Sequence, residues 1–234
     1  PKSAAANPVE YIDFFGPFAK EYDAVIHISV SAKLSSCYQN ACLAAQEYDN
    51  VSVIDSENIC TGQGYLVLRA AKWAADGLTA RNICMRLQNL ANRVELSFVL
   101  NQLNYMAKSG RCSGVLAFGA NILGIKPMIL FKEGEIFSAG VARGRQKSFE
   151  KALDLLMTYL ADHNGTPDDY CITVGYGYDA DEGKRLWMQT RAALRAKYPT
   201  CECNVVLLQI GCTIAVHTGP YALGMGVMRR WKKQ

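Results

Sequence analysis

The sequence predicts an α/β protein of two domains, in which a parallel-sheet domain precedes a mixed-sheet domain. The chain has 234 residues and half of them are apolar, so one large core or two small ones can form. Up to residue 93 helices and strands alternate, which favours a parallel sheet. Beyond it, a hairpin signal indicates antiparallel neighbours. We therefore predict domains over residues 1–93 and 94–234.

The first domain is expected to have the order helix, strand, helix, strand, helix, helix. Pro8 suits the first turn of a helix, and Gly16-Pro17 is expected to end or kink that helix. Hydrophobic periodicity and composition then predict a strand over 23–30, a helix over 38–46, a strand over 51–54 and helices over 65–75 and 79–91.

In the second domain, Glu133-Gly134-Glu135 separates two apolar runs and predicts a hairpin. The segment 114–124 is almost entirely apolar and is compatible with a buried helix. The remaining predictions are strands over 95–100, 126–132, 136–141, 170–175 and 203–208, a short helix near 103–106, and helices over 145–161 and 179–197.

Several function classes are excluded or disfavoured. Lys and Arg exceed Asp and Glu by only four, 25 against 21, and no basic run interleaved with aromatic residues precedes the last six residues, which argues against a nucleic-acid partner. The sequence contains no P-loop, no Gly-x-Ser-x-Gly elbow and no His-Glu-x-x-His motif. It has no signal peptide and no apolar run approaching 18 residues, so no membrane span is expected.

The nine cysteines are interpreted as reduced, mostly buried apolar side chains. They include no Cys-x-x-Cys pair, and the three histidines show no ligand spacing to them, so we expect no metal and no cofactor. Reduced cysteines favour a cytoplasmic location. The first residue is Pro rather than Met, and we therefore expect the chain to be a fragment or a processed product.

The chain is organised around a strand at 23–30, a serine-rich loop and a helix at 38–46. Such a strand–loop–helix junction is where an α/β protein binds an anion, because the first N–H groups of the helix are unpaired and the dipole is positive there. Ser35 and Ser36 lie at this junction and are also good N-cap residues. The loop therefore predicts either an anion site or an ordinary helix cap.

Arg111 is the only charged residue between Lys108 and Lys126. An arginine in apolar surroundings needs an anionic partner, since an unpaired buried charge is costly, and a carboxylate or a phosphate matches its planar fork. The alternative is an ordinary salt bridge across the domain boundary. His217 follows a β-like run over 213–216 and is expected at a strand end, either as a hydrogen-bond donor or as a structural histidine.

Arg143 and Arg145 follow the hairpin at a helix start, where the dipole disfavours cations. Exposed basic residues that oppose the local electrostatics suggest a surface that docks a partner, and a solvated helix end is the simpler alternative. The basic residues at 229–233 are interpreted as a solvated tail, with transient contact to an anionic membrane surface as the alternative.

Together these stretches resemble the DegV family of bacterial fatty-acid-binding proteins, over almost the whole chain. The shared motifs occur in the family's order. They are Ser3 to Pro8 (family Thr-Ser-Gln-Pro-Ser-Pro), Ser31 to Gln39 (Ser-Ser-x-Leu-Ser-Gly-Thr-Tyr-Gln), Asp55-Ser56 with Gly62 to Gly64 (Asp-Ser…Gly-Gln-Gly), Ser109 to Arg111 (Gly-Gly-Arg), Ile125 to Pro127 (Ile-Lys-Pro) and His217 to Tyr221 (His-x-Gly-Pro-Gly).

The resemblance implies a two-domain α/β fold with one long-chain fatty acid in a tunnel between the domains. It implies that hydroxyls at Ser3 and Ser35 bind the carboxylate, with Ser36 beside them and Arg111 and His217 nearby. Family members present the carboxylate to a separate fatty acid kinase, which makes acyl-phosphate. The position of Arg143 resembles part of the surface that docks the kinase.

This sequence departs from the family pattern at several places. The second serine of Ser-Ser-x-Leu-Ser is Ala32, and the Gly-Thr after Ser35 is Ser36-Cys37. The last glycine of His-x-Gly-Pro-Gly is Tyr221. The family's N-terminal Asp-Ser-Thr-Ala-Asp-Leu segment has no counterpart, so we expect the first strands of the first sheet to be missing.

The first hypothesis is thus a non-catalytic fatty-acid carrier that serves a kinase. Burying about fifteen carbons of an acyl chain at roughly 0.8 kcal/mol each contributes about 12 kcal/mol before association costs, so few polar contacts suffice. The alternative is a serine-dependent lipid hydrolase or acyl transferase with Ser35 as nucleophile and His217 as base. A nucleic-acid-binding regulator is disfavoured by the small net charge.

Overall fold

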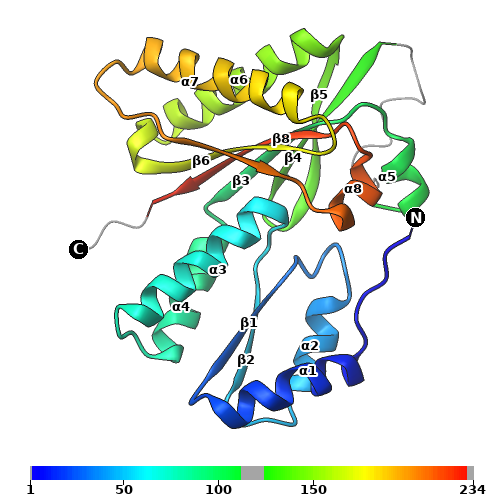
Figure 1. The fold of residues 1–234 in the computed structure, drawn as a ribbon, viewed down its shortest axis with the longest axis vertical. Helices are drawn as coiled ribbons and strands as arrows, with labels where there is room; N and C mark the ends of the chain where they lie inside the picture. The colour runs from blue at the N-terminus through cyan, green and yellow to red at the C-terminus, as the bar shows by residue number, and fades with distance from the viewer. Residues whose placement is uncertain (1, 112–123, 231–234) are drawn as a thin grey trace. The chain divides into compact units, whose positions relative to one another are not determined.

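The computed structural model describes residues 2–111 and 124–230, and the chain forms two compact units. The N-terminal unit consists of residues 3–93 and of 132–135, a short segment within the second half of the chain. The C-terminal unit takes up the chain from Val94 onward apart from that segment. Figure 1 shows the chain coloured from blue at the N-terminus to red at the C-terminus.

The N-terminal unit has a two-stranded parallel sheet with helices on both faces. Its elements are α1 (Pro8–Glu21), β1 (Val25–Ser29), α2 (Cys37–Ala45), β2 (Val51–Asp55), α3 (Cys60–Ala75) and α4 (Ala80–Ala91). β1 and β2 pair in parallel, with Val25 opposite Val51. This arrangement confirms the predicted parallel sheet.

Alternation along β1 decides which helices cover each face of this sheet. Ile26 and Ile28 pack with Leu66 and other side chains of α3 and α4. His27 points the other way, toward the α1 side, where its ring lies 5.4 Å from the ring of Phe15. Burial in this layer lowers the pKa of His27, so its imidazole is kept neutral.

Helix α1 runs through Pro17 to Glu21, so the helix does not end at this proline. A proline inside a helix costs about 3 kcal/mol, because it removes one backbone hydrogen bond and crowds the preceding turn. Two features offset this cost. Asn7 and Glu10 form a reciprocal capping box at the start of the helix, and Phe15 is buried against the sheet.

The C-terminal unit is built on a six-stranded mixed sheet with the strand order β5-β4-β3-β8-β6-β7. Its elements are β3 (Val94–Val99), α5 (Asn104–Ser109), β4 (Ile125–Lys132), β5 (Glu135–Arg143), α6 (Arg145–Asp162), the 3-10 turn η2 (Pro167–Asp169), β6 (Tyr170–Tyr176), α7 (Ala180–Lys197), β7 (Val205–Gln209), α8 (Cys212–Thr218) and β8 (Leu223–Arg229). β3 is antiparallel to β4 and β8, whereas β6 and β7 are parallel. The predicted mixed sheet is confirmed.

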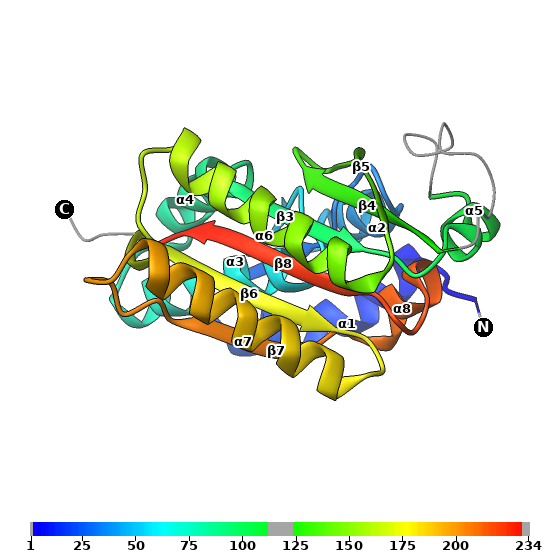
Figure 2. The ribbon, with the colours of Figure 1, turned by 90° about the horizontal axis from the view of Figure 1, so that it is seen from above.

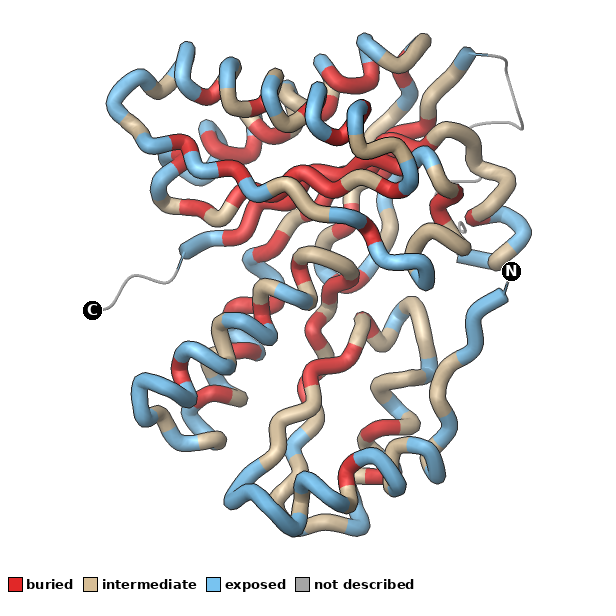
Figure 3. The backbone as a smooth tube through the Cα atoms, in the orientation of Figure 1, coloured by how far each residue is buried: buried red, intermediate tan, exposed pale blue. Residues whose placement is uncertain are grey.

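Helices α6 and α7 cover one face of this sheet (Figure 2). The main core of the unit lies between these helices and β3, β6 and β8, and Figure 3 shows the buried backbone following the central strands. Leu160 of α6 and Leu186 of α7 are fully buried there, together with Ile172 of β6. Among the residues that the structure describes, no helix is long and apolar enough to cross a membrane.

Strand β8 is central in the sheet, but the sequence pattern does not predict it. Gly224 and Gly226 lower its strand propensity. The structure shows why a glycine is used, because a Cβ on Gly224 would lie 2.9 Å from the ring of Phe98 on β3. The predicted helix over 114–124 falls almost entirely on residues 112–123, outside the described part of the chain.

Candidate functional site

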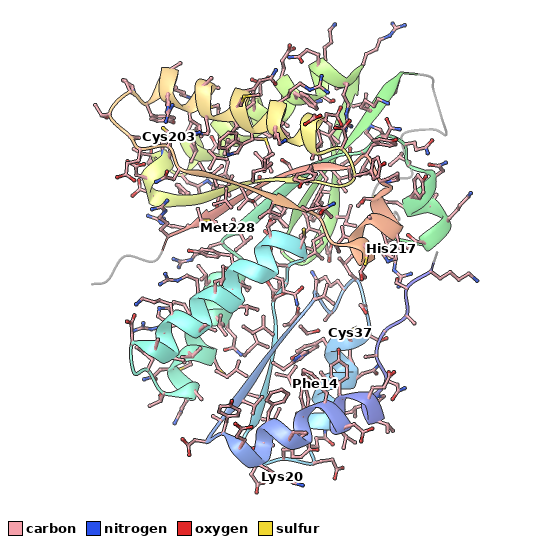
Figure 4. The ribbon with its side chains drawn as sticks, in the orientation of Figure 1. Phe14, Lys20, Cys37, Cys203, His217 and Met228 are labelled. Carbon is pink, nitrogen blue, oxygen red and sulfur yellow. The ribbon has the colours of Figure 1, made fainter. Side chains whose placement is uncertain are left out.

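The serine loop of the N-terminal unit leads from the carboxyl end of β1 into α2. Ser36 is the N-cap residue of α2, but its side chain makes no capping hydrogen bond. Ser35 fills that role, since its Oγ accepts a hydrogen bond from the backbone N–H of Cys37 at 3.3 Å. The same hydroxyl donates to Cys37 Sγ at 3.1 Å. Figure 4 labels Cys37 at the start of α2.

A second polar group reaches the same helix start from α1. Burial and a hydrogen bond with Cys37 raise the pKa of Tyr11, which keeps this phenol protonated. The segment with Ser3 is held to α2 from the other side, because the Asn40 amide donates to the carbonyl of Ala6 at 2.7 Å. Ser3 itself is exposed. These contacts gather hydroxyl and thiol groups at one helix N-terminus.

Ser31, the first serine of the same loop, is fully buried and structural. Its hydroxyl donates to the Gly134 carbonyl at 2.8 Å. Gly134 has a φ of +77°, and a Cβ there would lie 2.9 Å from Ser31 Oγ, so this close contact requires a glycine.

Arg111 follows α5 in the C-terminal unit, directly after Gly110, which ends the helix in the left-handed conformation. Its guanidinium is exposed, and Nη1 donates to the Ser109 carbonyl at 2.6 Å. The apolar stretch that follows Arg111 in the sequence lies outside the described part of the chain. Counting the described residues alone, the exposed guanidinium has one neutral acceptor, which leaves most of its donors available for an anion.

His217 lies in the last turn of helix α8, so its expected place at a strand end is wrong. The β-branched residues before it form a helix because Gly211 starts the segment and Gly219, with a φ of +83°, ends it. Burial and the positive charge of Arg111 both hold the pKa of His217 below its usual value. Figure 4 labels His217 on this helix.

Arg111 and His217 are brought together by the packing of α5 against α8. The chain comes close to α5 at Gly219, where a Cβ would lie 2.7 Å from the ring of Tyr105. The two residues are 106 positions apart in the sequence, and the packing of α5 against α8 brings the charge of Arg111 close to the imidazole of His217. A guanidinium cation and an imidazole thus lie close together in one cluster.

Arg143 is exposed at the end of β5, in keeping with the predicted basic surface. Arg145 is different, because its side chain is only 20% exposed. Its guanidinium forms a two-point ion pair with Glu182 on α7 and also donates to the Tyr221 carbonyl at 2.6 Å. The expectation that Arg145 is an exposed residue is corrected, since its donors are turned into the fold.

Sequence reasoning did not identify Glu182, Gly177 or Tyr105 as residues that shape this region. Glu182 looks like an ordinary acidic residue in the first turn of a helix capped by Asp179. The one signal in the sequence that could have indicated Glu182 is Arg145, a cation at the start of α6 with no acidic residue in the same turn. It predicts an acidic partner but not the position of that partner along the chain.

Metal chemistry finds no support in the part of the chain that the structure describes. No group of three or more His, Cys, Asp or Glu side chains there is arranged to hold an ion. The eight cysteines within the described residues carry free thiols.

Comparison with known proteins places these features in a family. The model of the family described as "Uncharacterised protein, DegV family" matches residues 1–230. A DegV domain-containing protein of Deinococcus radiodurans is 28% identical over 229 residues, covering 97% of this chain and 78% of the relative.

Two solved structures are similar throughout the chain. A stearic-acid-binding protein from Eubacterium ventriosum is 31% identical with a TM-score of 0.84, covering 97% of this chain and 78% of that one. A DegV family protein from Thermus thermophilus, described by its fatty acid binding, is 29% identical with a TM-score of 0.82, covering 98% and 79%. The chain belongs to the DegV family.

Proposed function

We propose that this protein binds one long-chain fatty acid and presents its carboxylate to a separate fatty acid kinase. The observation that carries the proposal is the proximity of Arg111, just after α5, to His217 on α8. Similar structures are described as binding stearic acid or fatty acid. A carboxylate is the ligand group that matches both the planar fork of an arginine and the N–H of an imidazole.

The N-terminal unit carries hydroxyls of its own, which we propose as hydrogen-bond donors to a carboxylate. Ser35 donates to a thiol sulfur, which is a weak acceptor. Exchanging this acceptor for a carboxylate oxygen strengthens the hydrogen bond, because a charged acceptor makes bonds about twice as strong as a neutral one. Ser3 and Ser36 are exposed and complete the proposed set of hydroxyls.

The proposal describes a carrier rather than an enzyme. A nucleophilic serine needs a base within hydrogen-bond reach. Within the described residues, the hydrogen bonds of the Ser35 hydroxyl go to Cys37, which supplies an N–H and a weakly accepting sulfur. The reduced cysteines also support the proposed cytoplasmic location.

Native mass spectrometry of the purified protein tests the binding function directly. We expect a one-to-one complex whose mass excess matches a long-chain fatty acid, and extraction under denaturing conditions identifies the chain. Delipidated protein incubated with stearate should regain the same mass excess. A protein that carries no lipid and takes up none would contradict the proposal, and turnover of acyl esters would replace it with the hydrolase alternative.

Arg143 is the residue through which the kinase partnership can be tested. Its side chain is exposed, so Arg143→Ala is expected to leave the fold and the bound fatty acid unchanged. Acyl-phosphate formation by a fatty acid kinase should nevertheless fall severalfold, through weaker association of the two proteins. Arg185→Ala, on α7, is the control for loss of one positive charge. Equal kinase activity with both variants would remove Arg143 from the docking surface.

A further inference from the structure

Arg145 occupies a position that its own helix does not favour. It is the first residue of α6, after an N-cap glycine that supplies no side-chain hydrogen bond. A cation at a helix N-terminus is opposed by the dipole. The Glu182 carboxylate compensates for this, and it is itself only 11% exposed on its side chain. A buried ion pair adds little net stability compared with apolar packing, so its geometry calls for another explanation.

The ion pair directs one further donor at the backbone. Arg145 Nε and Nη2 bind the two oxygens of Glu182, which fixes the plane of the guanidinium. Nη2 then also donates to the carbonyl of Tyr221 at 2.6 Å. The guanidinium carbon of Arg145 also lies 5.7 Å from the centre of the Phe149 ring. The guanidinium is therefore held by α6 and α7 and holds a third segment in turn.

That third segment is the turn that follows His217. The Pro220 carbonyl accepts from the N–H of Tyr178 at 2.7 Å, and the Ala222 carbonyl accepts from the N–H of Gly177 at 2.9 Å. Backbone groups after β6 thus hold the two outer carbonyls. The carbonyl between them, that of Tyr221, is held by the side chain of Arg145.

We infer that Arg145, fixed by Glu182, is a positioning residue that sets the turn after His217 and thereby the orientation of the His217 imidazole. This inference rests on the proposed function, in which His217 binds the fatty acid carboxylate. It gives Arg145 a role inside the ligand site, whereas Arg143, two residues earlier and exposed, stays on the surface.

Arg145→Lys and Glu182→Gln test the inference with small changes of shape. Lysine keeps the charge but cannot bind Glu182 at two points and Tyr221 at the same time. Glutamine keeps the size of Glu182 but loses the charge. We expect each variant to weaken stearate binding about tenfold and to shift the imidazole titration of His217, followed by NMR. Asp181→Asn is the matched control, since this neighbour on α7 has an exposed side chain and should change neither quantity.

The charge-exchanged double variant Arg145→Glu with Glu182→Arg separates positioning from stability. It can restore an ion pair, but a glutamate at position 145 has no donor for the Tyr221 carbonyl. We expect thermal stability to recover more than stearate affinity. If Arg145→Lys lowers the melting temperature while the His217 titration and the affinity stay as in the wild type, Arg145 is structural only and the inference is wrong.

The proposed function and the positioning role of Arg145 fail in distinguishable ways. If the wild-type protein binds no stearate, the proposed function fails, but the His217 titration still reports on the turn. If the wild type binds stearate and neither variant changes the titration, the proposed function stands and the role of Arg145 is refuted.

Discussion

Gly177→Ala is expected to destabilise the C-terminal unit by about 3 kcal/mol, at the upper end of the usual cost of overpacking. A Cβ at this position would lie 2.1 Å from the carbonyl oxygen of Pro220 and 3.0 Å from its carbonyl carbon. These are backbone atoms that cannot rotate away. The turn must therefore move, and its hydrogen bonds with residues 177 and 178 must be strained or lost.

Denaturant unfolding measures the loss in the free energy of unfolding, and the NMR signals of His217 report whether the turn at Pro220 has moved. Gly175→Ala, two residues earlier on β6, is the matched control, because its Cβ would meet the Ile210 side chain at 3.2 Å, and that side chain can adjust. We expect a clearly smaller loss there. Equal losses for the two variants would show that the Pro220 contact is not the cause.

Arg111→Ala should weaken fatty acid binding by roughly tenfold to a hundredfold, the range for losing a hydrogen bond to a charged group. The side chain is exposed and makes one hydrogen bond to a nearby carbonyl, so the fold should be unaffected. Titration of the delipidated variant with stearate measures the change in affinity. Lys108→Ala, an exposed cation on α5, is the control for charge alone.

The same variant has a second readout whose sign is fixed by the electrostatics. Burial and the charge of Arg111 both lower the pKa of His217, so removing Arg111 leaves burial as the remaining cause. The pKa of His217 should therefore rise toward its ordinary value in Arg111→Ala, and the imidazolium form should appear at a higher pH in an NMR titration. Unchanged affinity and an unchanged titration together would contradict the proposed cluster.

Local sequence patterns predicted most of the secondary structure, because helices, strands and turns depend largely on residues that are close together in the sequence. The hairpin around Gly134 and the amphipathic helix from Arg145 follow from turn chemistry and periodicity. The helix does not end at Pro17, where capping and burial of Phe15 outweigh the cost of a proline, and the prediction failed at β8, whose glycines look unsuitable for a strand. Both differences arise where tertiary packing outweighs local propensity.

For the candidate site, the sequence by itself determined the residue types, the family resemblance and the two classes of polar group, hydroxyls and cations. Only the tertiary structure decided what each residue contacts. It showed Arg111 exposed, His217 in a helix beside it, and Arg145 turned inward to Glu182 and Tyr221. The physical reason is that a pattern encodes the face and the local conformation of a side chain, whereas its partner depends on which distant segment the fold packs against it.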